Sequence, residues 1–233
     1  MISHKHKFIF IHIPKCAGSS IRDFYFDTPN LDWKVPNYDL LYGWCPKRKI
    51  HLQHATAKQL LETGLISREI WESYYKFTFV RNPWDRVYSA YLWVMKDCGL
   101  KGPFQDFILR EGVFKDVLTN QESKSTRSCH MWSQTDFFTI NGSYNLDYIG
   151  RIETLQDDIK YINNQLGIEK QFKEHSNKSP KRAKHYSLSY GQKKQKLVES
   201  LYKSDIELLK YSFENKISGL HLFKDLFKLK DAK

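Results

Sequence analysis

Cysteine is scarce in this sequence, and its placement argues against two classes of protein. The 233 residues include four cysteines, namely Cys16, Cys45, Cys98 and Cys129. No two of them form a C-x-x-C pair, and the spacing is not that of a disulfide framework, so we expect a reducing compartment. A zinc site built on Cys45, His51 and His54 would lack a fourth ligand at a suitable spacing, so we expect no metal site.

Long hydrophobic runs are also missing. No stretch approaches the length of about 18 apolar residues that a membrane-spanning helix needs. The first eight residues lead directly into a strand pattern, without the apolar segment of a secretory signal. We therefore expect a cytoplasmic protein with no transmembrane segment, folded as one domain over residues 1–233.

Acidic residues are outnumbered, with 26 Asp and Glu against 37 Lys and Arg, which gives a net charge of +11. This balance favours anionic partners such as nucleotides, nucleic acids or acidic polysaccharides. The excess is concentrated in residues 170–196, where nine basic residues accompany one acid, Glu174. The stacking motifs of common RNA-binding modules are absent, so nucleic acid is not the expected partner.

The chain is organised around residues 8–20, which read FIFIHIPKCAGSS. Six residues of strand character lead through Pro14 into a short loop, and a helix is expected to begin near Ser19 and Ser20. The first N–H groups of a helix have no partner within it and carry partial positive charge, so such a junction binds anions. Gly18 allows close approach of the backbone to a ligand, and Lys15 adds a full charge. An ordinary turn between a strand and a helix is the alternative interpretation.

A second junction of the same kind follows about 65 residues later. Residues 76–80 predict a short buried strand. Asn82 and Pro83 then suit the cap and first position of a helix over residues 84–96. The alternation of strands and helices predicts an α/β fold with a central, mostly parallel sheet flanked by helices. Both junctions should lie at the carboxyl ends of strands, where such sheets bind ligands.

The first junction lacks the G-x-x-x-x-G-K-[ST] spacing of a Walker A loop, and no Walker B aspartate is evident, so nothing requires a metal. The two junctions instead resemble the cofactor motifs of sulfotransferases that use 3′-phosphoadenosine 5′-phosphosulfate (PAPS). The sequences HIPKCAGSS and FVRNPWDRVYSAY are similar to the corresponding motifs of the heparan and chondroitin sulfotransferase family and its bacterial relatives. Segments 54–56, 149–153 and 177–179, together with Gln134, agree with this resemblance, which spans most of the chain.

The resemblance implies a P-loop-like site with distinct roles for its residues. The first loop would hold the 5′-phosphosulfate, with Lys15 neutralising charge as the sulfuryl group leaves. Arg81 and Ser89 would hold the 3′-phosphate, and the basic loop would close over the nucleotide. The expected cofactor-binding residues are Lys15, Cys16, Ala17, Gly18, Ser19, Ser20, Arg81, Ser89, Ser179, Lys181 and Arg182. Cys16 departs from the Thr or Ser of relatives, and Arg86 is expected to be structural.

A histidine is the expected general base, because its pKa lies near neutrality. His54 matches the family's histidine, and His51 is the alternative. An extended segment would point these two side chains to opposite faces, so only one should reach the cleft. His12 is expected to pack or hydrogen-bond within the first strand, and Gln134 and Glu153 are expected to be structural.

The leading hypothesis is therefore a sulfotransferase that moves a sulfuryl group from PAPS to a hydroxyl of a carbohydrate, which could be an acidic glycan. Residues 27–48 and 100–128 are the expected acceptor loops. One alternative is a small-molecule kinase with an unusual phosphate loop. The other is a non-catalytic protein that binds polyanions through its positive charge.

Overall fold

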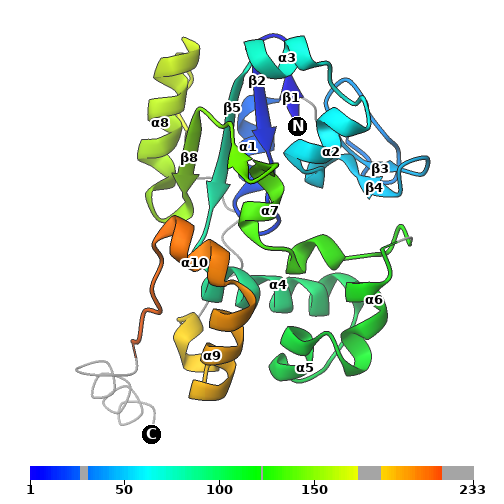
Figure 1. The fold of residues 1–233 in the computed structure, drawn as a ribbon, viewed down its shortest axis with the longest axis vertical. Helices are drawn as coiled ribbons and strands as arrows, with labels where there is room; N and C mark the ends of the chain where they lie inside the picture. The colour runs from blue at the N-terminus through cyan, green and yellow to red at the C-terminus, as the bar shows by residue number, and fades with distance from the viewer. Residues whose placement is uncertain (27–30, 122, 173–184, 217–233) are drawn as a thin grey trace, which may run out of the picture.

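The computed structural model describes residues 1–26, 31–121, 123–172 and 185–216, and a four-stranded sheet lies at its centre (Figure 1). The strands follow the order β1 (Ile2–Ser3), β2 (Phe8–Ile11), β5 (Tyr75–Val80) and β8 (Tyr148–Arg151). β2, β5 and β8 are parallel, and β1 pairs with β2 in the antiparallel sense at the edge. The expectation of an α/β fold with a mostly parallel sheet is confirmed.

Burial on both faces marks β2 and β5 as central strands. All four residues of β2 and five of the six in β5 are buried, as in sheets that are covered on both faces. Phe10 and Phe77 stack across the two strands with ring centroids 5.2 Å apart. The predicted first strand was too long, since β2 ends at Ile11 and His12 belongs to the following loop.

Helices form two groups around this sheet. One group packs against the sheet in a single hydrophobic cluster, and its members are α1 (Gly18–Tyr25), α2 (Ala57–Glu62), α3 (Arg68–Ser73), α7 (Gln134–Phe138) and α8 (Leu155–Leu166). The other group builds a second cluster, and its members are α4 (Pro83–Cys98), α5 (Phe104–Leu109), α6 (Lys115–Thr119) and α9 (Gln192–Leu201). Figure 1 shows the second group beyond the carboxyl ends of the parallel strands. Two short hairpins complete the description: β3 (Trp44–Cys45) with β4 (Ile50–His51), and β6 (Thr139–Ile140) with β7 (Ser143–Tyr144).

The beginning of α4 confirms the predicted cap. The Asn82 side chain accepts a hydrogen bond from the Trp84 N–H at 3.2 Å, and Pro83 is the first helical residue. The Asn82 side chain satisfies one N–H group that a helix N-terminus leaves unpaired, and Pro83 has no N–H group to satisfy. This cap sets the position at which the chain leaves β5 and begins α4, immediately after Arg81.

The spacing of Val198, Tyr202, Ile206 and Leu209 predicts a single helix over residues 192–211, but this prediction is wrong, because the chain turns at Tyr202. α9 ends at Leu201 and α10 runs from Lys203 to Leu209. The buried Tyr202 hydroxyl donates to the Met131 carbonyl oxygen at 3.0 Å. The turn also lets the buried Asp205 carboxylate accept the N–H groups of Gln134 and Thr135, at 2.8 and 2.9 Å. Among the described residues, no helix is long and apolar enough to cross a membrane.

Candidate active site

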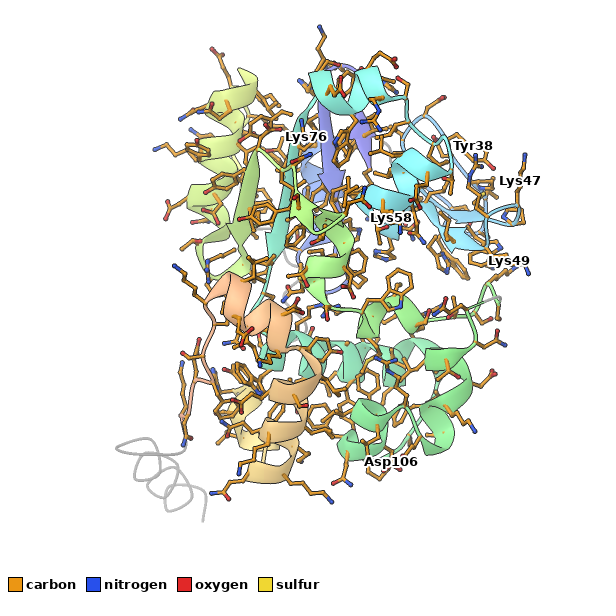
Figure 2. All side chains as sticks on the ribbon, viewed as in Figure 1. Tyr38, Lys47, Lys49, Lys58, Lys76 and Asp106 are labelled. Carbon is orange, nitrogen blue, oxygen red and sulfur yellow. The ribbon has the colours of Figure 1, made fainter. Side chains whose placement is uncertain are left out.

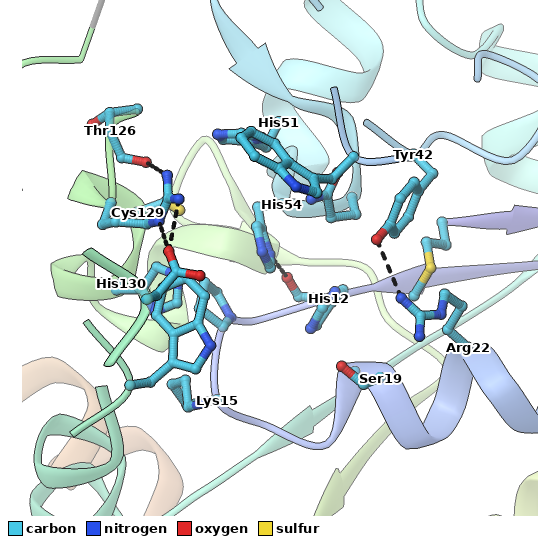
Figure 3. A pocket seen from close by; sticks show the side chains of 18 residues that line it. His12, Lys15, Ser19, Arg22, Tyr42, His51, His54, Thr126, Cys129 and His130 are labelled. Atoms are coloured by element: carbon cyan, nitrogen blue, oxygen red, sulfur yellow. Dashed lines mark hydrogen bonds and ion pairs between the residues drawn. The ribbon is translucent and has the colours of Figure 1, made fainter. Parts of the chain in front are cut away.

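A cavity of about 240 Å³ lies beyond the carboxyl end of β2 (Figure 3). Its wall combines the loop between β2 and α1 with residues from the predicted acceptor segments. Lys15, Gly18 and Ser19 come from the loop, while Trp33 and Arg127 come from the two predicted acceptor segments. The cavity therefore lies between this loop and parts of both segments that the sequence predicts to contact the acceptor.

The loop has an unusual backbone. Lys15 and Ala17 both adopt left-handed conformations, with φ of 69° and 56°. Cys16 lies between them, and its N–H donates to the Ile13 carbonyl oxygen at 3.2 Å. Residues that alternate in this way turn successive N–H groups toward one concave surface, a geometry typical of anion sites. The first turn of α1 adds N–H groups that have no acceptor within the helix.

Gly18 is required by its neighbour His12. A Cβ atom on Gly18 would overlap the His12 ring, with Nε2 the nearest atom and the two adjacent ring carbons almost as near. Glycine at position 18 therefore makes room for the His12 imidazole, and not only for a bound ligand. His12 does not merely pack within the sheet, since its ring lines the cavity beside His54 with centroids 4.5 Å apart.

His54 has a defined tautomer. Its Nδ1 lies 3.1 Å from the His12 carbonyl oxygen, which can only accept a hydrogen bond. Nδ1 of the neutral ring therefore carries the proton, and Nε2 keeps its lone pair for a ligand in the cavity that the ring lines. Burial lowers the pKa of His54 to about 3, so the ring is neutral at pH 7.

His51 also reaches the cavity wall, which corrects the expectation that only one of the two histidines faces it. The cause is local, because Leu52–His54 forms a 3-10 turn instead of continuing the extended strand. The His51 ring packs on Trp44 and Trp33, with centroids 4.9 and 5.9 Å away. Neither His51 nitrogen has a side-chain hydrogen-bond partner within the described part of the chain, and both are buried. A base must present a nitrogen to its substrate, so this packing favours His54.

Sequence reasoning missed the opposite wall of the cavity. His130 is 5% exposed and stacks on Trp93, with centroids 4.4 Å apart and planes 5° apart. The Arg127 guanidinium lies 5.5 Å from the centre of the Trp93 ring and 5.8 Å from that of Trp33. Asp97 accepts two hydrogen bonds from Arg127, at 2.9 and 2.7 Å. The aromatic content of 15% is the only sequence signal for this wall, since a high share of rings suggests either a rigid core or a cleft lined with rings.

These histidines should make stability depend on pH. Burial is the largest cause that lowers the pKa of His51 to about 4, that of His54 to about 3, and those of His12 and His130 well below their ordinary value. Below about pH 6.5 the unfolded chain binds protons that the folded protein does not, so the free energy of unfolding falls as the pH falls. The stability is fully present above about pH 6.5 and is lost progressively as the pH falls through the folded-state pKa values, which are about 4 for His51 and about 3 for His54.

We expect each histidine to contribute a slope of up to about 1.4 kcal/mol per pH unit. Urea unfolding at several pH values between about 7.5 and 5 measures the sum. In a His130→Gln variant, the slope of the free energy of unfolding against pH should be smaller by the contribution of one histidine. A free energy of unfolding that does not change over this range would contradict the prediction.

Hydrogen bonds through Cys16 and Gln134 connect the two junctions in the protein interior. The Cys16 side chain is fully buried, and its thiol donates to the Gln134 Oε1 atom at 3.5 Å. The same Oε1 accepts the Arg81 N–H, while Nε2 of Gln134 donates to the Arg81 carbonyl oxygen, both at 2.9 Å. Burial raises the pKa of the Cys16 thiol to about 12, which makes it a poor nucleophile. Gln134 is structural, as expected.

Arg81 and Ser89 lie outside the cavity wall. Arg81 Nε donates to Asp85 at 2.6 Å, and its Nη1 donates to the Lys15 carbonyl oxygen at 3.1 Å. The contact joins the two junctions directly. Ser89 lies on α4, and its role with Arg81 at a phosphate stays a prediction. The other predicted nucleotide contacts, Ser179, Lys181 and Arg182, lie outside the described residues.

Arg86 is structural, as expected. The side chain is fully buried, and it donates to the carbonyl oxygens of Pro14, His130 and Trp132 at 3.3, 3.3 and 2.8 Å. It therefore ties the first loop to the wall that carries His130. Within the described segments, no group of three or more His, Cys, Asp or Glu side chains is arranged to hold a metal ion.

Comparison with known proteins gives one family. The model of the sulfotransferase family matches residues 1–212. The chain is also similar to an uncharacterized protein from Archaeoglobus fulgidus, with 24% identity over 104 residues that cover 44% of this chain and 76% of the relative. No solved structure matches the chain significantly. The family match spans both junctions and the whole cavity wall, and the chain belongs to the sulfotransferase family.

Proposed function

We propose that this sulfotransferase takes its sulfuryl group from PAPS and transfers it to a hydroxyl of a carbohydrate, with His54 as general base. The observation that carries the proposal is the placement of His54. Its tautomer leaves a lone pair on Nε2, and its ring lines the same cavity as Lys15 and the beginning of α1. A base and an anion-binding loop thus share one space, as in-line transfer to a hydroxyl requires.

The first loop fits the phosphosulfate end of such a donor. Its left-handed residues turn N–H groups toward one surface, and Gly18 and Ser19 line the cavity where α1 begins. Lys15 lines the same wall, with Nζ 5.3 Å from the centre of the Trp93 ring. We infer that the loop contacts are made by Lys15, Ala17, Gly18, Ser19 and Ser20. The buried thiol of Cys16 supports the loop from below instead.

The far end of the donor carries a 3′-phosphate, and we assign it to Arg81 and Ser89. A guanidinium beside a hydroxyl suits a phosphate, because it offers a fork of donors and a fixed charge. Asp85 orients the Arg81 side chain through its 2.6 Å contact. Ser179, Lys181 and Arg182 remain proposed nucleotide contacts on the basis of the resemblance.

His54 would accept the proton of the acceptor hydroxyl at Nε2, and the acceptor oxygen would form the new S–O bond. Lys15 would stabilise the electron pair that stays on the phosphate oxygen when the old S–O bond breaks. Negative charge brought into the cavity raises the pKa of a nearby imidazole. The low pKa of His54 therefore keeps the ring unprotonated in the free protein, and the negative charge of the bound donor raises the basicity of Nε2.

The acceptor side of the cavity supports a carbohydrate. Trp33 lines the wall, and its large ring with a polar edge suits the alternating apolar and hydroxyl faces of a sugar, whereas His130 and Arg127 already pack on Trp93. The decisive experiment is transfer of labelled sulfuryl from PAPS, screened across glycans, lipids and small alcohols. Transfer to a glycan supports the proposal, whereas magnesium-dependent ATP turnover without sulfuryl transfer would overturn it.

Lys15→Ala should weaken the binding of the product nucleotide, 3′-phosphoadenosine 5′-phosphate, by about tenfold to a hundredfold. The reason is the loss of one charge-assisted contact, which contributes about 1.5–3 kcal/mol. Isothermal titration calorimetry measures the affinity, and Arg81→Ala should weaken it to a similar degree.

Lys58→Ala is the matched control, since it removes one positive charge from a side chain that is 54% exposed on α2 (Figure 2). Its affinity should equal that of the wild type, because exposed charges at a distance are screened by salt. Unchanged affinity in both Lys15→Ala and Arg81→Ala would overturn the assignment of the nucleotide site.

A further inference from the structure

His12 has a position that its expected role as a core residue does not explain. Its ring stacks on Phe10 with centroids 5.6 Å apart, lies beside His54 and lines the cavity. Gly18, the first residue of α1, lacks a side chain where the ring passes. The fold thus places the His12 imidazole where the loop ends and α1 begins.

The two nitrogens of His12 have different surroundings. Nδ1 is buried and has no hydrogen-bond partner among the described residues. A proton on Nδ1 would bury an unpaired N–H donor, which is rarer and more costly in proteins than an unpaired acceptor. The neutral ring must carry its one proton on one of the two nitrogens, so this environment favours Nε2.

Nε2 differs from Nδ1, because it is not among the buried side-chain nitrogens without a partner in the described residues. The position of a Cβ on Gly18 would lie almost as close to both adjacent carbons as to Nε2, so it lies over the face of the ring. Gly18 therefore leaves the in-plane direction of Nε2 uncovered. A proton on Nε2 can then meet an acceptor inside the cavity, next to the first N–H groups of α1.

We propose that His12 is a catalytic residue that donates a hydrogen bond from Nε2–H to an oxygen of the transferring sulfuryl group. The inference rests on the proposed function for the identity of the anion. Together with the N–H groups of the loop, His12 would stabilise charge on the sulfuryl oxygens as the old S–O bond breaks. A neutral donor held in advance in a buried site can stabilise a developing charge without any rearrangement.

His12 and His54 would then act as a pair with opposite tautomers. His54 carries its proton on Nδ1, bound to the His12 carbonyl oxygen, and accepts at Nε2. His12 carries its proton on Nε2 and donates there. Burial keeps both rings neutral, and the adjacent cation Lys15 also disfavours a charged His12. The two histidines are chemically identical, and their different surroundings make His12 a hydrogen-bond donor and His54 a base.

Nitrogen-15 NMR of the full chain tests the tautomers without any substrate. The spectra of the free protein at pH 7 should show His12 protonated at Nε2 and His54 protonated at Nδ1. His12→Gln and His54→Asn variants assign the signals by their disappearance. A His12 ring protonated at Nδ1, or one that is doubly protonated, would overturn the inference whatever the reaction proves to be.

Three substitutions test the hydrogen bond itself. The Gln side-chain nitrogen can occupy the place of Nε2, the Asn nitrogen can occupy only that of Nδ1, and Phe keeps the ring without a donor. Relative to wild type, His12→Asn and His12→Phe should lower kcat for sulfuryl transfer by about 10²–10³-fold, the usual effect of removing one such donor. His12→Gln should retain most of the activity, and all three variants should bind the product nucleotide like the wild type.

The outcomes separate the two proposals. If the wild type transfers no sulfuryl group from PAPS, the proposed function fails, and the NMR result still decides the tautomer of His12. If the wild type is active and His12→Phe is equally active, only the inference about His12 fails. Thermal unfolding of each variant checks the fold, and equal loss of activity in Gln and Phe variants of normal stability would also contradict the donor role.

Discussion

His54→Asn is expected to lower kcat for sulfuryl transfer by about 10²–10⁴-fold, the contribution that a positioned general base makes. The Asn side-chain nitrogen can take the place of Nδ1 and keep the hydrogen bond to the His12 carbonyl oxygen. The basic nitrogen is then the only group removed, so affinity for the product nucleotide should not change. Steady-state kinetics and calorimetry on the same variant separate the two effects.

His51→Asn is the matched control, because His51 lines the same cavity while both of its nitrogens are buried. Its packing on Trp44 and Trp33 predicts a change in acceptor KM or stability rather than a large loss of kcat. Full turnover in His54→Asn together with a large loss in His51→Asn would transfer the role of base to His51. Full turnover in both would contradict a histidine base at these two positions.

Arg86→Met is expected to reduce the free energy of unfolding by about 3–5 kcal/mol, because each buried acceptor that loses its hydrogen-bond donor costs about 1–3 kcal/mol. The substitution keeps apolar volume but leaves the carbonyl oxygens of Pro14, His130 and Trp132 without their donor. Domains of this kind have a total stability of about 5–15 kcal/mol, so the effect is large. Urea unfolding at neutral pH measures it.

Arg110→Met is the control for Arg86. Arg110 is exposed, and among the described residues its side chain makes one hydrogen bond, to the Met131 carbonyl oxygen at 3.4 Å. Its substitution should change stability by no more than about 0.5 kcal/mol, as is usual on the surface. Equal effects of the two substitutions would contradict the view that Arg86 ties the first loop to the wall carrying His130.

The sequence predicted well those features that depend on neighbouring residues. The buried strands β2 and β5 follow from short segments rich in aromatic and β-branched residues, and the beginning of α4 follows from Asn82 and Pro83. The meeting of the two junctions at one edge of the sheet follows because both come directly after parallel strands. His51 and His54 were also identified before the structure, although their relation to the cavity was not.

Predictions failed where a distant partner decides the local conformation. The break between α9 and α10 depends on the Tyr202 hydroxyl finding the Met131 carbonyl oxygen, 71 residues away. The pattern of apolar residues continues across this point, so periodicity alone gives no sign of it. A second prediction failed for a local reason, because a 3-10 turn at Leu52–His54 replaces the expected extended segment and brings both histidines to the cavity.

The sequence by itself determined the family, the α/β architecture and the two junctions, because motifs, hydrophobic runs and caps act over a few residues. Only the tertiary structure decided how the cavity is built. It turned the Cys16 thiol into the core toward Gln134, set the His12 ring over Gly18, and brought His130 to the opposite wall. Each of these placements depends on packing between segments that are separated in the chain, where side-chain volume and the need to pair buried polar groups select one arrangement.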